Sequence, residues 1–379
     1  MKYEIFDWMR EEQARRTALF TDVFHGRPVD HIPLEIRVSD DMFSIRQHFF
    51  GKNEEWLQDS LRAVQLTWDL GTHTDAIPAF CADVGCSCIA NAFGSEYVFL
   101  GSENQTPSVK KRIITDLEDQ IDDLQKPDLT RAHWIQEGLR RMRRFAELGQ
   151  EFTPQCGLDA AGGINVASDL MGVSELLVSM LSEPEAVHRL LEIIQQTYLD
   201  LIALEVESCG GLANMTTTDF YAGWAPMGFK GHCSDDISAM IAPGLYQQFS
   251  APYHARIYEK YGPGGLHNCG PNPCHGVYMD GPNTPVYLDL NEIYSREDLP
   301  KLKESLRGRG FLRWGSDLRD PDEIVKTYTA QMELLVPDVM LIPTYTVQRP
   351  DEGIALYDRL LPIAEEYAGR MNFVPFRRS

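Results

Sequence analysis

The chain has 379 residues, of which 43% are hydrophobic and 24% are charged, a balance typical of globular proteins and unlike that of disordered chains. Its formal net charge of −21 argues against nucleic acid or an anionic membrane as a partner, because both would be repelled. The charged N-terminal stretch lacks the apolar core of a signal peptide, and there is no apolar run of roughly 20 residues. We therefore expect a soluble, cytoplasmic protein whose eight cysteines are thiols.

Amphipathic segments alternate with short apolar runs, a pattern typical of βα units. The clearest helix is predicted after Ser182, which has capping-box spacing with Glu185, and it is expected to end at Gly210-Gly211. Further along the chain the pattern predicts helices over residues 243–262, 296–306, from 321 onward and 350–369, with strands at 264–270, 285–290, 310–317 and 339–345.

Polar residues or glycines follow most of the predicted strands. A doubly wound open sheet gives the same alternation, but no glycine-rich dinucleotide fingerprint follows an early strand. We therefore predict an α/β fold, a (βα)₈ TIM barrel with an N-terminal helical extension, as a single domain over residues 1–379. Active sites of such barrels lie where the strands end, which yields these candidates: Glu35, Arg37, Asp83, Cys156, Asp159, Asp219, Tyr221, His267, Cys269, Asp289, Asp317 and Tyr345.

The strongest local signal is LHNCGPNPCHG, residues 266–276. Side chains two apart on a strand point the same way, so we expect His267 and Cys269 to converge. With Cys274 beyond the turn they offer the three protein ligands of a catalytic zinc site, which keeps a fourth position open. The alternative is that Cys269 is a buried thiol and His267 a hydrogen-bonding residue of the cleft.

Two other segments carry candidate chemistry. In AFCADVGCSC, residues 79–88, Asp83 is a candidate general acid or base with a raised pKa, or alternatively a turn residue. Residues 216–236 are rich in glycine and aromatic residues and predict a substrate loop. Its pocket candidates are Asp219, Tyr221 and Trp224, unless the aromatic rings only anchor the loop.

Four segments are similar to one known family: FHGRPVDHIPL (24–34), GVSELLVSMLSEPEAVHRLL (172–191), SDDISAMIAPGLYQQFSAPY (234–253) and LHNCG (266–270). Together they resemble the uroporphyrinogen decarboxylase superfamily. It contains the haem-pathway decarboxylase and the zinc-dependent methyltransferases that move methyl groups between corrinoid proteins and thiols or methoxy compounds. The resemblance implies a (βα)₈ barrel.

The resemblance also implies roles for individual residues. It places Asp83 where the decarboxylases keep their catalytic aspartate, and His267 and Cys269 where the methyltransferases keep their zinc pair. The arginine-rich substrate motif of the decarboxylase is missing, since PLEIRVSDDM (33–42) has Arg37 alone, and several arginines are needed to bind the carboxylates of a porphyrinogen. A further zinc cysteine is expected near Tyr345. Without it, Cys274 or a carboxylate such as that of Asp83 completes the set, or no zinc binds.

We therefore predict a corrinoid-linked methyltransferase that acts on a small methylated substrate, with a methoxy, thiol or related group. In this prediction zinc binds at His267 and Cys269, and a separate protein carries the corrinoid. The expected pocket residues are Arg37, Asp219, Tyr221, Trp224 and Tyr345. One alternative is a metal-free decarboxylase that uses Asp83, and another is an inactive barrel that binds a corrinoid protein or a small ligand. The sequence does not determine the oligomeric state and is compatible with a homodimer.

Overall fold

The computed structural model describes residues 4–40, 42–110, 112–148, 152–220, 223–271 and 273–376. Its main sheet has the strand order β1-β8-β7-β6-β5-β4, and each neighbouring pair is parallel. The first strand therefore pairs with the last, as in a barrel. The strands are β1 (Glu35–Val38), β4 (His232–Ser234), β5 (Gly265–Asn268), β6 (Tyr287–Asn291), β7 (Phe311–Ser316) and β8 (Leu341–Val347). A separate antiparallel pair joins β2 (Tyr97–Val98) to β3 (Ser108–Val109).

Three short extended segments continue this sheet from β4 back to β1. Each is joined to its neighbour by backbone hydrogen bonds, and two of the contacts are parallel bridges. From β4 onward these bonds run from Thr218 N–H to the Lys230 carbonyl, from Gln155 N–H to the Asn214 carbonyl, from Phe80 N–H to the Pro154 carbonyl, and from Asp75 N–H to the Leu34 carbonyl. Hydrogen bonds thus pass around the whole ring, and the predicted α/β barrel is confirmed.

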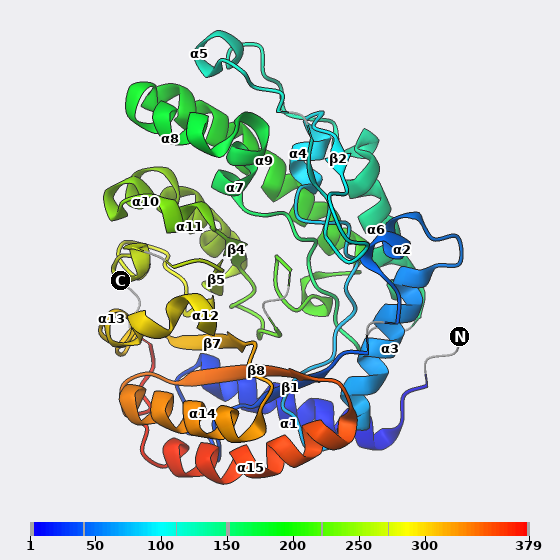
Figure 1. Ribbon diagram of the computed structural model, residues 1–379, viewed down its shortest axis with the longest axis vertical. Coiled ribbons are helices and arrows are strands. Elements are labelled where there is room, and N and C mark those ends of the chain that lie inside the picture. Colours follow the sequence, from blue (N-terminus) through cyan, green and yellow to red (C-terminus); the bar gives the residue numbers. More distant parts are fainter. Residues whose placement is uncertain are drawn as a thin grey trace.

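Helices surround the sheet (Figure 1). In this view α14 and α15 lie on the outer side of β8 and β1, while α7 to α11 lie toward the opposite end of the molecule. The helices are α1 (Asp7–Phe24), α2 (Ile45–Phe50), α3 (Glu55–Asp69), α4 (Cys88–Ala92), α5 (Leu117–Gln120), α6 (His133–Glu147), α7 (Gly163–Met171), α8 (Val173–Ser182), α9 (Pro184–Ser208), α10 (Pro243–Phe249), α11 (Ala251–Tyr261), α12 (Glu292–Ser295), α13 (Leu299–Leu306), α14 (Pro321–Leu335) and α15 (Pro350–Ala368).

The N-terminal helix α1 closes one end of the barrel, which confirms the predicted helical extension. The ring of Phe24, its last residue, lies 5.7 Å from the ring of Tyr287 and 5.1 Å from that of Phe311, measured between centroids. Tyr287 and Phe311 are the first residues of β6 and β7. The amino ends of the strands are therefore covered, and the carboxyl ends are left for a site.

The predicted helices and strands of the second half are confirmed, apart from shifts at their ends and a break between α10 and α11. The capping box predicted at Ser182 is wrong. Ser182 is the last residue of α8, its hydroxyl donates to the Val178 carbonyl, and α9 begins at Pro184 without a side-chain cap. A serine at a helix end can bond back to the carbonyl four residues earlier, and this competes with the capping role.

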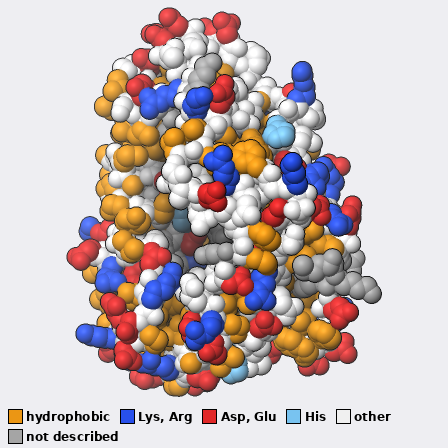
Figure 2. All heavy atoms as spheres, turned by 45° about the vertical axis from the view of Figure 1, so that its right-hand side comes forward, with side chains coloured by type: hydrophobic (Ala, Val, Ile, Leu, Met, Phe, Trp, Pro, Cys, Tyr) orange, Lys and Arg blue, Asp and Glu red, His pale blue; other side chains and the backbone are white. Residues whose placement is uncertain are grey.

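Within the described ranges, no single helix is long and apolar enough to cross a membrane, and α7 with α8 passes that test only as a pair bent by 107°. Figure 2 shows charged side chains of both signs spread over one face of the molecule, with hydrophobic side chains gathered along its left edge.

Candidate functional site

Three adjoining cavities lie at the carboxyl ends of the strands of the barrel. The largest has a volume of about 620 Å³ and is lined by Asp159, Asp236, His267 and Cys269, among others. A second, of about 460 Å³, shares Phe220 with it. A third, of about 310 Å³, shares several residues with the second. This is the end of a barrel at which active sites form.

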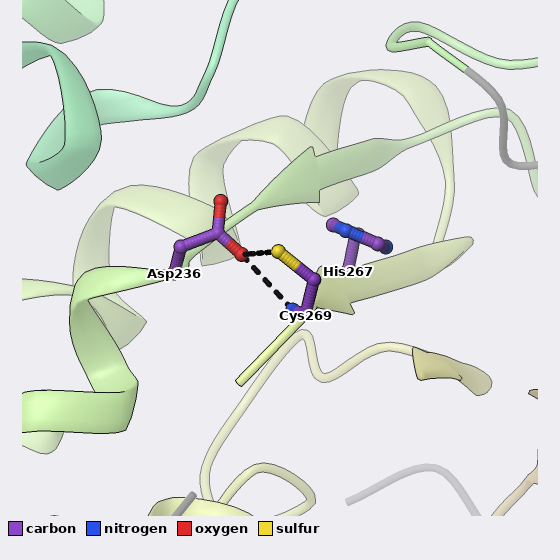
Figure 3. A group of neighbouring side chains, drawn as sticks. All are labelled: Asp236, His267 and Cys269. Atoms are coloured by element: carbon purple, nitrogen blue, oxygen red, sulfur yellow. Dashed lines mark hydrogen bonds between the residues drawn. The ribbon is translucent and has the colours of Figure 1, made fainter. Parts of the chain in front are cut away.

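Asp236, His267 and Cys269 converge on the largest cavity (Figure 3). One potential ligand atom from each residue lies within 4.8 Å of those of the other two. His267 is the third residue of β5 and pairs in register with Ser234, the last residue of β4. Cys269 directly follows β5, and Asp236 follows β4 by two residues. Two neighbouring parallel strands thus deliver all three side chains to the same edge of the sheet.

Asp236 is fixed from both sides. Its Oδ1 accepts hydrogen bonds from the amide N–H and from the thiol of Cys269, each at 3.0 Å. Its Oδ2 accepts from Nδ2 of Asn165 on α7 at 3.2 Å, and its own N–H donates to Oδ1 of Asn165 at 3.0 Å. The carboxylate therefore has a defined orientation toward the sulfur.

The imidazole of His267 is oriented by Asp289, its register partner on β6. Nδ1 of His267 lies 3.0 Å from Oδ2 of Asp289. Burial alone would lower the pKa of His267, but hydrogen bonds with Asp289 and Cys269 and the charges of Asp289 and Asp236 raise it well above its usual value. With Nδ1 engaged, Nε2 is the nitrogen left for a ligand, the arrangement in which a carboxylate orients a metal-binding histidine.

These three donors fit a zinc ion. Imidazole nitrogen, thiolate sulfur and carboxylate oxygen are the ligand types that zinc binds, and catalytic sites use three protein ligands. The predicted third ligand, Cys274, is not part of the group. It is buried, and its thiol donates to the carbonyls of Ser238 and Ile241 at 3.5 Å each. Asp236 takes its place in the group, whereas Cys274 packs against residues 238–241.

Two further carboxyl groups lie beside this group. Burial raises the pKa of Asp159 well above its usual value, and the charges of Asp219 and Asp83 add to the effect. Asp219 is fully buried, and burial raises its pKa to about 6, although hydrogen bonds from the N–H groups of Phe220 and Ala160 act in the opposite direction. Asp219 is not among the residues that line the largest cavity. It bonds to the backbone of Phe220, which does line that cavity, and so supports the loop at this point.

The raised pKa of Asp219 predicts that the stability of the protein depends on pH. Its pKa is about 6 in the folded protein and about 4 in an unfolded chain, so the folded state holds the proton more tightly. The contribution of Asp219 to the free energy of unfolding therefore decreases as pH rises from about 4 to about 6, and it stays low above that. We therefore expect the free energy of unfolding of Asp219→Asn to rise relative to that of the unmodified protein between pH 4 and pH 7, when both are measured by chemical denaturation. A difference between the two proteins that does not change with pH would contradict the raised pKa of Asp219.

Asp83 lies in the second cavity. Its Oδ1 accepts a hydrogen bond from Gly85 N–H at 2.7 Å, so it has the alternative turn role while also facing the cavity. Its backbone carbonyl accepts a hydrogen bond from Arg141. Asp83 is not in the three-donor group with His267. The carboxylate of Asp236, which follows β4, has the place in this group that we expected for a carboxylate such as that of Asp83.

The other predicted pocket residues have different positions. Arg37 lines the third cavity, with Nη2 3.8 Å from Oε1 of Glu35. Trp224 packs on the protein instead: its ring centroid lies 5.1 Å from Nζ of Lys230, and its carbonyl accepts a hydrogen bond from Arg313. It therefore anchors the loop, in agreement with the alternative interpretation of this segment. Tyr221 lies outside the described residues.

Tyr345 does not shape the pocket, which corrects the prediction. It is 1% exposed, and burial raises the pKa of its hydroxyl. Successive side chains of a strand face opposite sides. On β8, Thr344 bonds to Glu35 and Thr346 lines the third cavity, so Tyr345 between them points outward.

Asp236 and Asn165 were missed by sequence reasoning. Residues 216–236 were predicted to form one long loop, but they contain the three-residue strand β4. The signal was the pair Asp235-Asp236 directly after the short segment His-Cys-Ser, because polar residues after a barrel strand lie at the active-site end. Nothing in the local sequence distinguishes Asn165, which is brought to Asp236 by the packing of α7.

The fold and this site define a barrel protein with a nitrogen, sulfur and oxygen donor group at its mouth. The family model of uroporphyrinogen decarboxylase (URO-D) matches residues 16–217, more than half of the chain. The chain therefore belongs to the uroporphyrinogen decarboxylase family. The match includes Asp83, whereas His267 and Cys269 lie beyond it.

A solved structure of a methyltransferase from Methanosarcina mazei has a similar fold. The TM-score is 0.63 with 18% sequence identity, over 93% of this chain and 98% of that chain. At this identity the likeness shows the fold. A comparison with curated proteins gives no match.

Proposed function

We propose that this protein is a methyltransferase that removes a methyl group from a small methylated substrate, with a zinc ion held by Asp236, His267 and Cys269. The observation that carries the proposal is the convergence of these three donors on one cavity at the mouth of the barrel. The shared fold with a methyltransferase from Methanosarcina mazei supports it.

The residues around the donors have separate tasks in this proposal. When bound, zinc supplies Lewis-acid polarisation of the substrate heteroatom that carries the methyl group. Asp289 fixes the ring of His267 through Nδ1, and Asn165 fixes the carboxylate of Asp236. Cys269 supplies the sulfur. Asp159, whose pKa is raised by burial, lines the same cavity and is placed to hold a proton beside the substrate.

The charge of the cavity favours a small substrate over a porphyrinogen. The described residues that line the largest cavity include Asp159 and Asp169 but neither lysine nor arginine. Arg141 reaches the second cavity, but its guanidinium is engaged by Glu137 and by backbone carbonyls. Since a porphyrinogen needs several charge-assisted pairs for its carboxylates, a neutral or cationic methylated group fits better. The methyl acceptor that we propose is a corrinoid carried by a partner protein.

An assay with a free corrinoid tests the proposal. Zinc-loaded protein is incubated with reduced cobalamin and a series of methoxy, methylthio and methylamine compounds, and methylcobalamin is followed by its absorbance. We expect methylcobalamin with at least one class of compound, and loss of this activity in Cys269→Ala. Cys274→Ser is the matched control and keeps the activity, because its sulfur lies outside the donor group.

Two outcomes would contradict the methyltransferase. Carbon dioxide released from a carboxylate substrate without zinc, and lost in Asp83→Asn, would indicate the decarboxylase. A ligand or a corrinoid protein that binds tightly without any turnover would indicate a binding protein.

A further inference from the structure

Two cysteines away from the donor group face each other at the barrel mouth. The sulfur atoms of Cys81 and Cys156 lie 2.9 Å apart. The residues before them, Phe80 and Gln155, form a parallel bridge, and Cys156 N–H donates to the Phe80 carbonyl at 2.8 Å. Cys81 and Cys156 therefore occupy the next position of the same register, on the same face of two neighbouring segments.

This placement suits a disulfide. Neighbouring strands lie about 4.8 Å apart, and disulfides join residues whose Cα atoms are roughly 4.4–6.8 Å apart. Since the two sulfur atoms are already in contact, a bond between them requires each to move by only a fraction of an ångström.

The pair is also reachable from the mouth. Both residues line the cavity of about 310 Å³, and Cys81 lines the cavity of about 460 Å³ as well. By contrast, Cys209 and Cys233 are fully buried in the hydrophobic core and are not among the residues that line these two cavities. A small oxidant that enters the mouth therefore meets Cys81 and Cys156 together.

We propose that Cys81 and Cys156 are a redox-active dithiol that closes to a reversible disulfide at the mouth of the barrel. The oxidant is a low-molecular-weight disulfide. One cysteine thiolate attacks a sulfur of this compound, forms a mixed disulfide and expels one thiolate. The second cysteine then attacks the protein sulfur of the mixed disulfide and expels the other. The two cysteines lose two electrons and two protons, and the small disulfide is reduced to two thiols.

The disulfide has a direct consequence for the mouth. It links the segment that leads to Asp83 covalently to the segment that leads to Asp159, and it moves the sulfur atoms of two residues that line these cavities. We therefore expect the shape of both cavities to depend on the redox state. This inference does not depend on zinc or on the reaction proposed above.

Thiol mapping of the full chain tests the inference. The reduced protein is incubated with oxidised glutathione, alkylated and digested, and the linked peptides are identified by mass spectrometry. We expect a Cys81–Cys156 cross-link that dithiothreitol reverses. In Cys156→Ser the cross-link is replaced by a glutathione adduct at Cys81, and Cys81→Ser is the reciprocal variant should the first fail to fold. Cys209→Ser is the matched control and keeps the cross-link.

The exposed Cys269 serves as an internal standard. If Cys269 acquires glutathione while no Cys81–Cys156 peptide forms, the oxidant was active and the proposed dithiol is refuted. Cross-links of Cys81 to other cysteines in the folded protein would refute it equally.

Discussion

Replacing Cys269 with alanine is expected to lower the zinc affinity by more than about 100-fold. Loss of a residue that only supports a ligand typically costs roughly 10–100-fold in affinity, and Cys269 contributes the sulfur of the donor group itself. The variant also loses the thiol hydrogen bond to Asp236, although the backbone N–H of residue 269 still donates to that carboxylate. The affinity is measured by competition with a chromophoric zinc chelator.

Two matched variants make this measurement specific. Asp289→Asn is expected to show a smaller loss, on the order of 10–100-fold, because it acts only through the orientation of His267. Cys274→Ala is expected to keep the affinity, since its sulfur bonds to backbone carbonyls elsewhere. If Cys274→Ala loses zinc and Cys269→Ala does not, the ion is not held by Asp236, His267 and Cys269.

Replacing Glu35 with alanine is expected to lower the free energy of unfolding by about 3–5 kcal/mol, the typical result of removing one partner of a buried ion pair. Glu35 is 2% exposed, and its Oε2 lies 3.5 Å from Nη1 of Arg313 and 3.2 Å from the hydroxyl of Thr344. The substitution deprives the buried guanidinium of a carboxylate partner inside the barrel. Urea denaturation measures the loss.

The surface pair between Glu304 and Arg307 provides the control. Both side chains are at least half exposed, and such pairs contribute less than about 1 kcal/mol, so Glu304→Ala is expected to unfold almost as the unmodified protein does. Equal losses in the two variants would show that the Glu35–Arg313 pair has no special role in holding the barrel together.

The second half of the barrel could be predicted from the sequence because its elements carry regular patterns. PVYLDL and VMLIPTY are short apolar runs between amphipathic segments, and they form β6 and β8. The helices on both sides of β8 also begin at a proline. The first half was harder. Its extended segments contribute single bridges at Phe80 and Gln155. Such short pairings form because distant segments meet when the barrel closes, and the local sequence shows no regular alternation that would predict them.

The candidate site could be predicted in part, because some of its residues are brought together by the local geometry of one strand. His267 and Cys269 are two apart on one strand, so local geometry was enough to bring them together. Asp236 joins them through the pairing of β4 with β5, which is a long-range contact. Tyr345 was misplaced because an apolar strand gives no sign of which alternate residues face inward when both of its faces are covered.

X-ray absorption spectroscopy of the zinc-loaded protein tests the central claim most directly. Zinc–sulfur and zinc–nitrogen or zinc–oxygen distances differ, at about 2.3 Å and about 2.0–2.2 Å, so the ligands can be told apart. A site made of Asp236, His267 and Cys269 predicts one sulfur, with the remaining ligands nitrogen or oxygen. A spectrum with two sulfur ligands, or with none, would contradict it, as would a protein that binds no zinc at all.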